Sequence, residues 1–229
     1  MTGQSLIQDD AMVFSASTPE TPSRWKRRKE ARPEEILGAA LELFTEKGFA
    51  ATRMDDVAKL AGISKGTLYN YFESKESIFH AVVQELIAPQ IEEFESMIAR
   101  YDGPTDHLLR QLIRTWWTRV GETRLSAIPK IVISESGNFP ELAQYFVDNV
   151  VKRARKLFTD IISKGVVTGE FNTVEPRTVA RLIVAPLVYA TIWQHSLQPF
   201  DDDYLSDEYI DTHIKFILRS LIKDQRIDL

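Results

Sequence analysis

The chain has 229 residues, of which 44% are hydrophobic and 27% charged, the proportions of an ordinary soluble protein with a sizeable core. It contains no cysteine, which excludes a disulfide framework and a thiolate metal site. The formal net charge is −5, yet residues 21–75 carry 11 Lys and Arg against 8 Asp and Glu. A basic segment in an otherwise acidic chain indicates a local anionic partner.

The first 23 residues are polar, contain no Lys or Arg and show no periodic apolar pattern. They lack the features of a secretory signal, and we expect a disordered tail. A basic run at residues 24–29 (RWKRRK) follows, which is either a solvated helix extension or an arm over a DNA backbone. The longest apolar run, residues 182–193, is too short to span a bilayer, so we expect a cytoplasmic protein without a membrane contact.

A first helix is predicted over residues 33–47. Pro33 suits the first turn of a helix, and the two glutamates that follow it lie at the positive end of the helix dipole. Gly48 is expected to end the helix. Apolar residues at helical spacing predict one buried side, formed by Ile36, Leu37, Ala40, Leu43 and Phe44.

Two short helices joined by a tight turn are predicted next. Thr52 is expected to cap the first of them, and Gly62 to end it in the left-handed conformation. Ser64 is expected to cap the second, over residues 65–71. This arrangement is a helix-turn-helix, whose second helix enters the major groove of DNA. The outer side of that helix offers hydroxyls, an amide and aromatic rings, which suit contacts with base edges and phosphates.

The remainder of the chain is predicted to be helical throughout. Ser74 is expected to cap a long helix that reaches about residue 100, and Pro89 inside it predicts a kink or a break. Further helical patterns occupy residues 104–120, 124–135, 139–165, 175–197 and 204–223. No segment shows the alternation of a β-strand, so the predicted fold is all-α with about nine helices.

Two stretches closely resemble the TetR family of bacterial transcriptional regulators. The first is I-L-x-A-A-L-x-L-F-x-E-K-G-F-x-A-T, from Ile36 to Thr52, and the second is D-V-A-x-x-A-G-I-S-K-G-T-L-Y-N-Y-F-x-S-K-E, from Asp56 to Glu76. They cover less than a fifth of the chain, but the motif is specific. The resemblance implies a homodimer with a helix-turn-helix DNA-binding domain (24–75) and an effector-binding and dimerisation domain (76–229).

The function implied by the resemblance is ligand-responsive transcriptional regulation. We expect a repressor that binds a palindromic operator in double-stranded DNA as a dimer and is released by a small molecule, with no cofactor. The helix from residue 75 joins the recognition helix to the C-terminal core, so a ligand is expected to act by tilting it. An alternative from a different class is a helical protein–protein adaptor with a vestigial helix-turn-helix. Salt-dependent binding to a palindrome separates the two hypotheses.

Resemblance and helix geometry together predict three sets of residues. DNA contacts are expected around the helix-turn-helix, from Thr52, Arg53, Ser64, Lys65, Gly66, Thr67, Tyr69, Asn70, Tyr71 and Lys75. An effector pocket is expected among aromatic residues and one histidine, namely His107, Trp116, Trp117, Phe139, Phe146, Tyr189 and Trp193. A four-helix dimer interface is expected from the last two helices, through Leu182, Leu187, Ile210, Ile214, Ile217, Leu218 and Leu221.

The sequence does not favour an enzyme. Residues 62–66 match the G-x-S-x-G motif of hydrolases, but that motif requires a strand before the serine, and the residues before it are predicted to be helical. The four histidines lack the i, i+3 or i, i+4 spacing of metal ligands on a helix, so no metal site is expected. No catalytic acid, base or nucleophile set can be assembled from the remaining residues.

Overall fold

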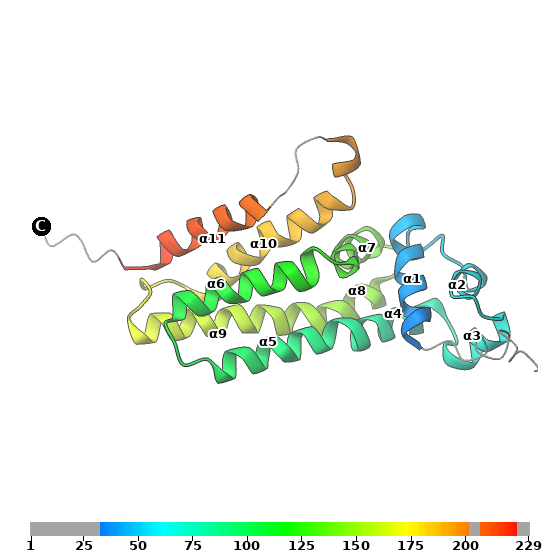
Figure 1. Cartoon of the computed structure of the whole chain (residues 1–229), viewed down its shortest axis with the longest axis horizontal. Coiled ribbons are helices and arrows are strands. Elements are labelled where there is room, and N and C mark those ends of the chain that lie inside the picture. Colours follow the sequence, from blue (N-terminus) through cyan, green and yellow to red (C-terminus); the bar gives the residue numbers. More distant parts are fainter. Residues whose placement is uncertain (1–32, 202–206, 224–229) are drawn as a thin grey trace, which may run out of the picture. The chain divides into compact units, whose positions relative to one another are not determined.

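The computed structural model describes residues 33–201 and 207–223. Over these ranges the chain forms eleven α-helices with short 3₁₀ and π-helical segments and no β-strand (Figure 1). Several helices follow one another without interruption, so they make up the nine helical segments that the sequence predicts. An isolated antiparallel bridge joins Phe171 to Ile222. The expected disordered tail and the basic run at 24–29 lie outside the described residues.

The N-terminal unit consists of α1 (Pro33–Lys47), α2 (Met54–Leu60) and α3 (Lys65–Tyr71), packed one on the next. Gly48 and Gly62 follow α1 and α2 with φ angles of +82° and +70°, the left-handed region that favours glycine. Both therefore end their helices as predicted. The apolar stripe predicted for α1 is buried, with Ile36, Leu37, Ala40, Leu43 and Phe44 in the core.

The other segments build a helical bundle, whose apolar core is continuous with that of the N-terminal unit. They are α4 (Lys75–Val82), η2 (Val83–Ile87), α5 (Ala88–Arg100), α6 (Thr105–Trp116), η3 (Trp117–Gly121), η4 (Arg124–Ala127), α7 (Ile128–Glu135), α8 (Pro140–Phe146), η5 (Val147–Val151), α9 (Lys152–Thr168), α10 (Pro176–Gln194), η6 (Gln198–Phe200) and α11 (Asp207–Leu221). Helices α5, α6 and α10 pack on α9, and α11 packs on α6 and α10. None of the helices in the described ranges is long and apolar enough to cross a membrane.

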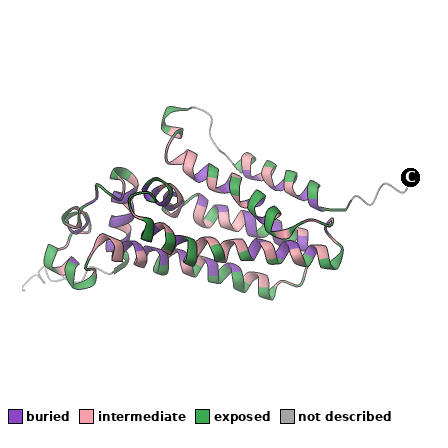
Figure 2. Cartoon of the chain, turned by 180° about the vertical axis from the view of Figure 1, so that it is seen from behind, coloured by how far each residue is buried: buried purple, intermediate pink, exposed green. Residues whose placement is uncertain are grey.

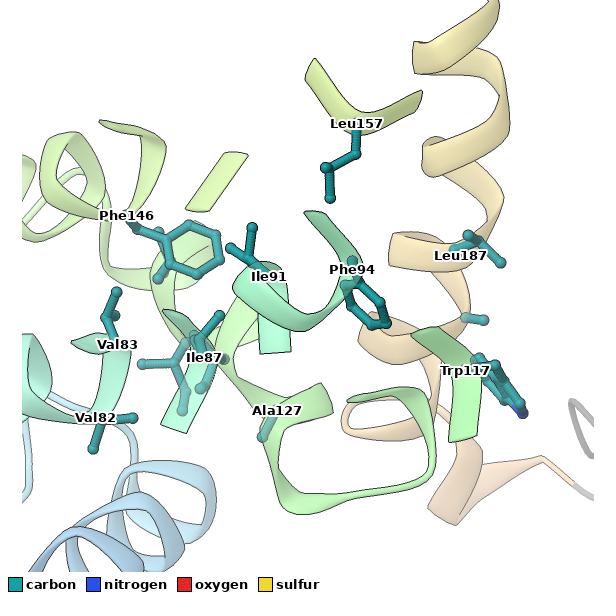
Figure 3. Packing of buried hydrophobic residues seen from close by; sticks show 14 of the residues in the cluster. Val82, Val83, Ile87, Ile91, Phe94, Trp117, Ala127, Phe146, Leu157 and Leu187 are labelled. Carbon is teal, nitrogen blue, oxygen red and sulfur yellow. The ribbon is translucent and has the colours of Figure 1, made fainter. Parts of the chain in front are cut away.

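The break predicted at Pro89 is present as the π-helical segment η2 between α4 and α5. Proline has no N–H to donate to the preceding turn, so the regular α-helical hydrogen-bond pattern cannot continue through this position. Segment η2 packs against η5, the π-helical segment between α8 and α9. Val83 and Ile87 are buried here in the same part of the core as Phe146 (Figure 3).

Burial differs between the bundle and the helix-turn-helix. Bundle helices bury one side and expose the other (Figure 2). Helices α2 and α3 bury only Val57, Ala58 and Leu68. Most of the surface of these two short helices is therefore free to meet another molecule.

Candidate nucleic-acid interface and the domain that carries it

Helix α3 is the exposed helix of the helix-turn-helix, and its first turn is capped as predicted. The backbone N–H of Thr67 donates to Oγ of Ser64, with 3.0 Å between the heavy atoms. Leu68 is fully buried and anchors the helix, which packs on α2, whereas Tyr69 and Tyr71 are 45% and 46% exposed. The outward side of α3 carries Lys65, Gly66, Tyr69, Asn70 and Tyr71. Such a helix meets the steric requirement for entering a groove.

An ion pair ties the start of α3 to α2. Nζ of Lys65 lies 2.8 Å from Oδ1 of Asp55, and both side chains are 62% exposed. The hydrogen bond to Asp55 raises the pKa of Lys65 above its ordinary value. Because the pair is exposed, it contributes little to stability, but it fixes a cation beside the outward side of α3. The same Nζ lies 5.9 Å from the centre of the Tyr69 ring.

Two further cations are exposed on the helix-turn-helix. Arg53 is exposed at the N-terminus of α2, as the predicted DNA contact requires, and Lys59 is exposed on the same helix. Lys59 is not among the DNA contacts predicted from the sequence. Its position on α2 could have indicated a phosphate contact, because the first helix of a helix-turn-helix crosses the DNA backbone.

Thr52 does not have the role predicted for it at the start of α2. The residue before α2 that acts as N-cap is Arg53, without a side-chain hydrogen bond. The hydroxyl of Thr52 instead donates toward the carbonyls of Gly48 (2.8 Å) and Leu43 (3.2 Å), and the residue is 2% exposed. The prediction that Thr52 caps α2 is wrong, because the free carbonyls at the end of α1 bind its hydroxyl. Its side chain is thereby withdrawn from the candidate DNA surface.

Lys75 also departs from its predicted role as an exposed phosphate contact. Its Nζ donates to the carbonyls of Phe49 (2.8 Å) and Ala50 (2.9 Å). It also lies 4.7 Å from the centre of the Phe49 ring and 5.2 Å from that of Phe139. The helix dipole disfavours a cation at the start of α4, and these contacts offset that cost. The side chain is thus engaged within the protein.

The sequence Gly62-Ile63-Ser64-Lys65-Gly66 is the turn of the helix-turn-helix. Ser64 follows helix α2 rather than a strand, and its hydroxyl caps α3. The hydrolase motif requires a strand before the serine, so that a sharp turn exposes its hydroxyl. Here a helix precedes the serine, and the hydroxyl binds the first turn of the next helix. Across the described ranges, no group of three His, Cys, Asp or Glu side chains is placed to hold a metal ion.

The residues predicted for an effector pocket are dispersed. His107 is exposed beside Asp106, and Tyr189 is 51% exposed on α10, so neither lines an enclosed pocket. Phe139 packs edge-on against Phe49 of the N-terminal unit, with ring centres 5.0 Å apart. Trp117 and Phe146 are buried in the bundle core, and Trp116 and Trp193 are partly buried.

Two clefts adjoin α1 at a place that the sequence does not predict. One, of about 340 Å³, is lined by α1, η4 and His195, and the other, of about 240 Å³, by α1 and α7. Nε2 of His195 lies 2.7 Å from Oγ of Ser126. Burial, assisted by the nearby charge of Lys130, lowers the pKa of His195.

Most residues predicted for the dimer interface belong to the protomer core. Leu187, Ile210, Ile214, Leu218 and Leu221 are at most 4% exposed, so the prediction that they meet a partner is wrong. They pack between α10, α11 and the rest of the bundle. Packing within the protomer requires the same helical spacing of apolar residues as packing against a partner. Ile217 is partly buried.

The open surface of α10 and α11 is formed by other residues. Leu182, which was predicted, is 60% exposed, and Tyr189 and Phe216 are 51% and 70% exposed. Leu182 and Tyr189 are seven residues apart, so they lie on one side of α10. That spacing is the signal in the sequence that could have identified Tyr189.

The three-helix unit with its exposed, capped second helix, carried on a larger helical domain, defines a helix-turn-helix DNA-binding protein. Comparison with family models identifies the family within this class. Residues 36–82 match "Bacterial regulatory proteins, tetR family", and residues 102–212 match "Tetracyclin repressor-like, C-terminal domain". The chain belongs to the TetR family and is a DNA-binding transcriptional regulator.

Similar proteins cover most of the chain. The HTH-type transcriptional repressor KstR2 of Mycolicibacterium smegmatis is 26% identical over 194 residues, which are 84% of this chain and 91% of that protein. The fatty acid metabolism regulator protein of Bacillus subtilis is 25% identical over 187 residues, 80% of this chain and 95% of that one. The crystal structure of FadR from Bacillus subtilis in complex with stearoyl-CoA gives a TM-score of 0.68 at 21% identity, with coverage of 82% and 99%. This structural likeness shows a shared fold.

Proposed function

We propose that the protein is a cytoplasmic, non-enzymatic repressor that binds a palindromic operator as a homodimer and is released by a small molecule. The observation that carries the proposal is α3, a capped helix that is anchored by Leu68 and free on its outward side. In a two-fold dimer, two such helices read successive major grooves about 34–36 Å apart. The name of the similar protein KstR2, a transcriptional repressor, supports repression.

The side chains on α2 and α3 divide into two proposed roles. Arg53, Lys59 and Lys65 are exposed cations of the helix-turn-helix, and they suit phosphate oxygens on either side of the groove. Asn70 is exposed on α3, and its amide can form a paired hydrogen bond with adenine. The first role supplies affinity for any sequence, and the second supplies sequence preference.

The open surface of α10 and α11 supports the homodimer. Leu182, Tyr189 and Phe216 are large apolar side chains that remain exposed in a single protomer. Pairing this surface with its copy across a two-fold axis would remove them from water as a four-helix bundle.

We propose an apolar metabolite with a carbonyl or carboxyl group as the effector. FadR of Bacillus subtilis is crystallised with stearoyl-CoA, and a solved structure of KstR2 from Mycobacterium tuberculosis is described as a ketosteroid transcriptional regulator. In the described part of this chain, Tyr145 Oη and Trp193 Nε1 are buried without a hydrogen-bond partner. Each is a donor that a ligand oxygen would satisfy.

Selection from a random pool of double-stranded DNA tests the DNA-binding proposal. The wild-type protein should enrich a palindrome and bind it with a strong inverse dependence on salt concentration. Enrichment of no sequence, or binding that is independent of salt, would favour the adaptor. Stearoyl-CoA, added to the selected complex, then tests the effector class: release by stearoyl-CoA but not by free coenzyme A supports an apolar effector.

A further inference from the structure

The turn between α1 and α2 is held from two sides by charged side chains. Lys75, the first residue of α4, donates to the carbonyls of Phe49 and Ala50. Glu135, the last residue of α7, accepts from the backbone N–H of Ala50, at 3.0 Å between N and Oε1. Ala50 therefore has its N–H bound by an anion and its carbonyl bound by a cation.

Glu135 is unusual because it is a carboxylate that is only 8% exposed. Within the described ranges no Lys, Arg or His forms an ion pair with it. Its second oxygen lies 3.5 Å from Nδ2 of Asn138. Burying an unpaired carboxylate is costly, so the hydrogen bond to Ala50 is a principal interaction that offsets the cost.

Aromatic packing joins the same two parts of the chain. Phe139, just beyond α7, packs edge-on against Phe49, which is fully buried. Nζ of Lys75 lies within cation–π distance of both rings. We call this set, consisting of Lys75, Glu135, Phe139 and the turn at residues 48–50, the latch.

The latch joins the turn that follows α1 to the end of α7 and the start of α4. The two clefts beside it show that packing there is incomplete. An ion pair between Glu42 of α1 and Arg124 of η4 spans the same junction, but Arg124 is 72% exposed and the pair is correspondingly weak. The partly buried hydrogen bond of Glu135 is the stronger polar connection.

We propose that Glu135 is a positioning residue for DNA recognition. It fixes the α1–α2 turn to the helical domain through α7, separately from the covalent connection through α4. The turn leads directly into α2, and α2 packs on α3. Loosening the latch therefore lets the recognition helices occupy a broader range of separations, and operator binding must then restrict that range at an entropic cost.

The test compares three substitutions of Glu135 on a DNA fragment selected by the wild-type protein, so it rests on the proposed function. E135A removes the acceptor, and E135D keeps the charge but withdraws the carboxylate by one methylene. Both should weaken operator affinity about tenfold and speed hydrogen exchange in peptides covering residues 48–52 by a similar factor. E135Q keeps an acceptor at the same reach and should stay within about threefold of the wild type.

The salt dependence separates positioning from direct contact. All three variants should keep the wild-type slope of log affinity against log salt concentration, because no phosphate contact is lost. E141A, which removes an exposed carboxylate from α8, is the control and should match the wild type. If E135A does not fold, the comparison of E135D with E135Q decides whether Glu135 is a positioning residue.

Equal operator affinity for E135D, E135Q and wild type would overturn the positioning role, as would an E135Q variant as weak as E135D. If the wild type selected no DNA, the proposed function itself would fall and the positioning role with it. The exchange rate of residues 48–52 would still report whether Glu135 holds the turn. The two failures are thus distinguishable.

Discussion

At the scale of single residues, the recognition helix depends on a hydroxyl that the sequence identifies correctly. Ser64 caps α3, and its replacement by alanine leaves the N–H of Thr67 without its acceptor. We expect Ser64→Ala to lower the free energy of unfolding by about 1 kcal/mol in urea titrations. Ser96→Ala, which removes an exposed hydroxyl from the middle of α5, is the control and should have little effect. Equal effects would show that the cap contributes nothing.

Asn70 and Lys59 should separate base reading from phosphate binding. Asn70→Ala is expected to relax sequence preference at one base pair in each half-site while leaving the salt slope unchanged. Lys59→Ala is expected to weaken binding to all sequences alike and to reduce the slope by about one for each protomer. Competition titrations with operator variants measure both quantities. If the two substitutions changed affinity and preference identically, the assignment of roles would be wrong.

Thr52 and Lys75 show where sequence reasoning about single residues fails. Both lie at the start of a helix, and local rules assign Thr52 to a cap and Lys75 to an exposed charge. In the structure the hydroxyl of Thr52 binds carbonyls at the end of α1, and the ammonium of Lys75 binds carbonyls of the turn that follows. Lys75 also lies near the ring of Phe139, 64 residues away in the sequence. Contacts between distant segments override local preference, and no local pattern encodes them.

At the scale of elements, periodicity predicted the helices well but not their partners. Ser64, Ser74 and Gly62 marked helix ends correctly, and Pro89 marked the π-helical break. The apolar stripe of α11, however, faces its own protomer instead of a partner. An i, i+3, i+4 pattern identifies a buried side without saying which chain buries it.

Substitutions of Phe216 and Leu218 on α11 test which residues meet a partner and which are buried in their own protomer. Phe216→Asp places a charge on an exposed position and should yield folded monomers, because the charge would be buried only in the dimer. Leu218→Asp places the charge in the protomer core and should unfold the protein or cause aggregation. Light scattering measures the mass, and circular dichroism the helix content. A wild-type protein that is folded and monomeric would refute the dimer.

The contact between α10 and α11 should also make stability depend on pH. His213 Nε2 lies 2.9 Å from the carbonyl oxygen of Ile183, and burial lowers the pKa of His213 despite that hydrogen bond. Below about pH 6.5 the unfolded chain therefore binds a proton more readily than the folded one. The free energy of unfolding should fall as the pH falls from there toward the folded pKa.

His213→Gln keeps an amide donor near Ile183 but does not titrate. Urea unfolding at pH 7.5 and pH 5.5 should show a smaller decline for this variant than for the wild type. An equal decline in both proteins would mean that His213 does not contribute to the pH dependence.

At the scale of the whole molecule, α1 packs on α4, η4 and α7, and two features of this junction bear on how the helix-turn-helix is coupled to the helical domain. One is the chain itself, which passes from α3 into α4, and the other is the latch. An effector in the helical domain can change operator affinity only through its different affinity for two arrangements of this junction. The coupling must be reciprocal, so operator and effector weaken each other's binding by the same factor.

In the proposed function, α3 reads a symmetric operator as one half of a dimer. Footprinting on the DNA upstream of the protein's own gene tests it most directly. We expect two protected half-sites related by a two-fold axis, with centres about one helical turn or a small multiple apart. Asn70→Ala should lose the sequence-specific protection while retaining weak general binding. A single asymmetric site, or protection that Asn70→Ala leaves unchanged, would mean that α3 does not read a symmetric operator.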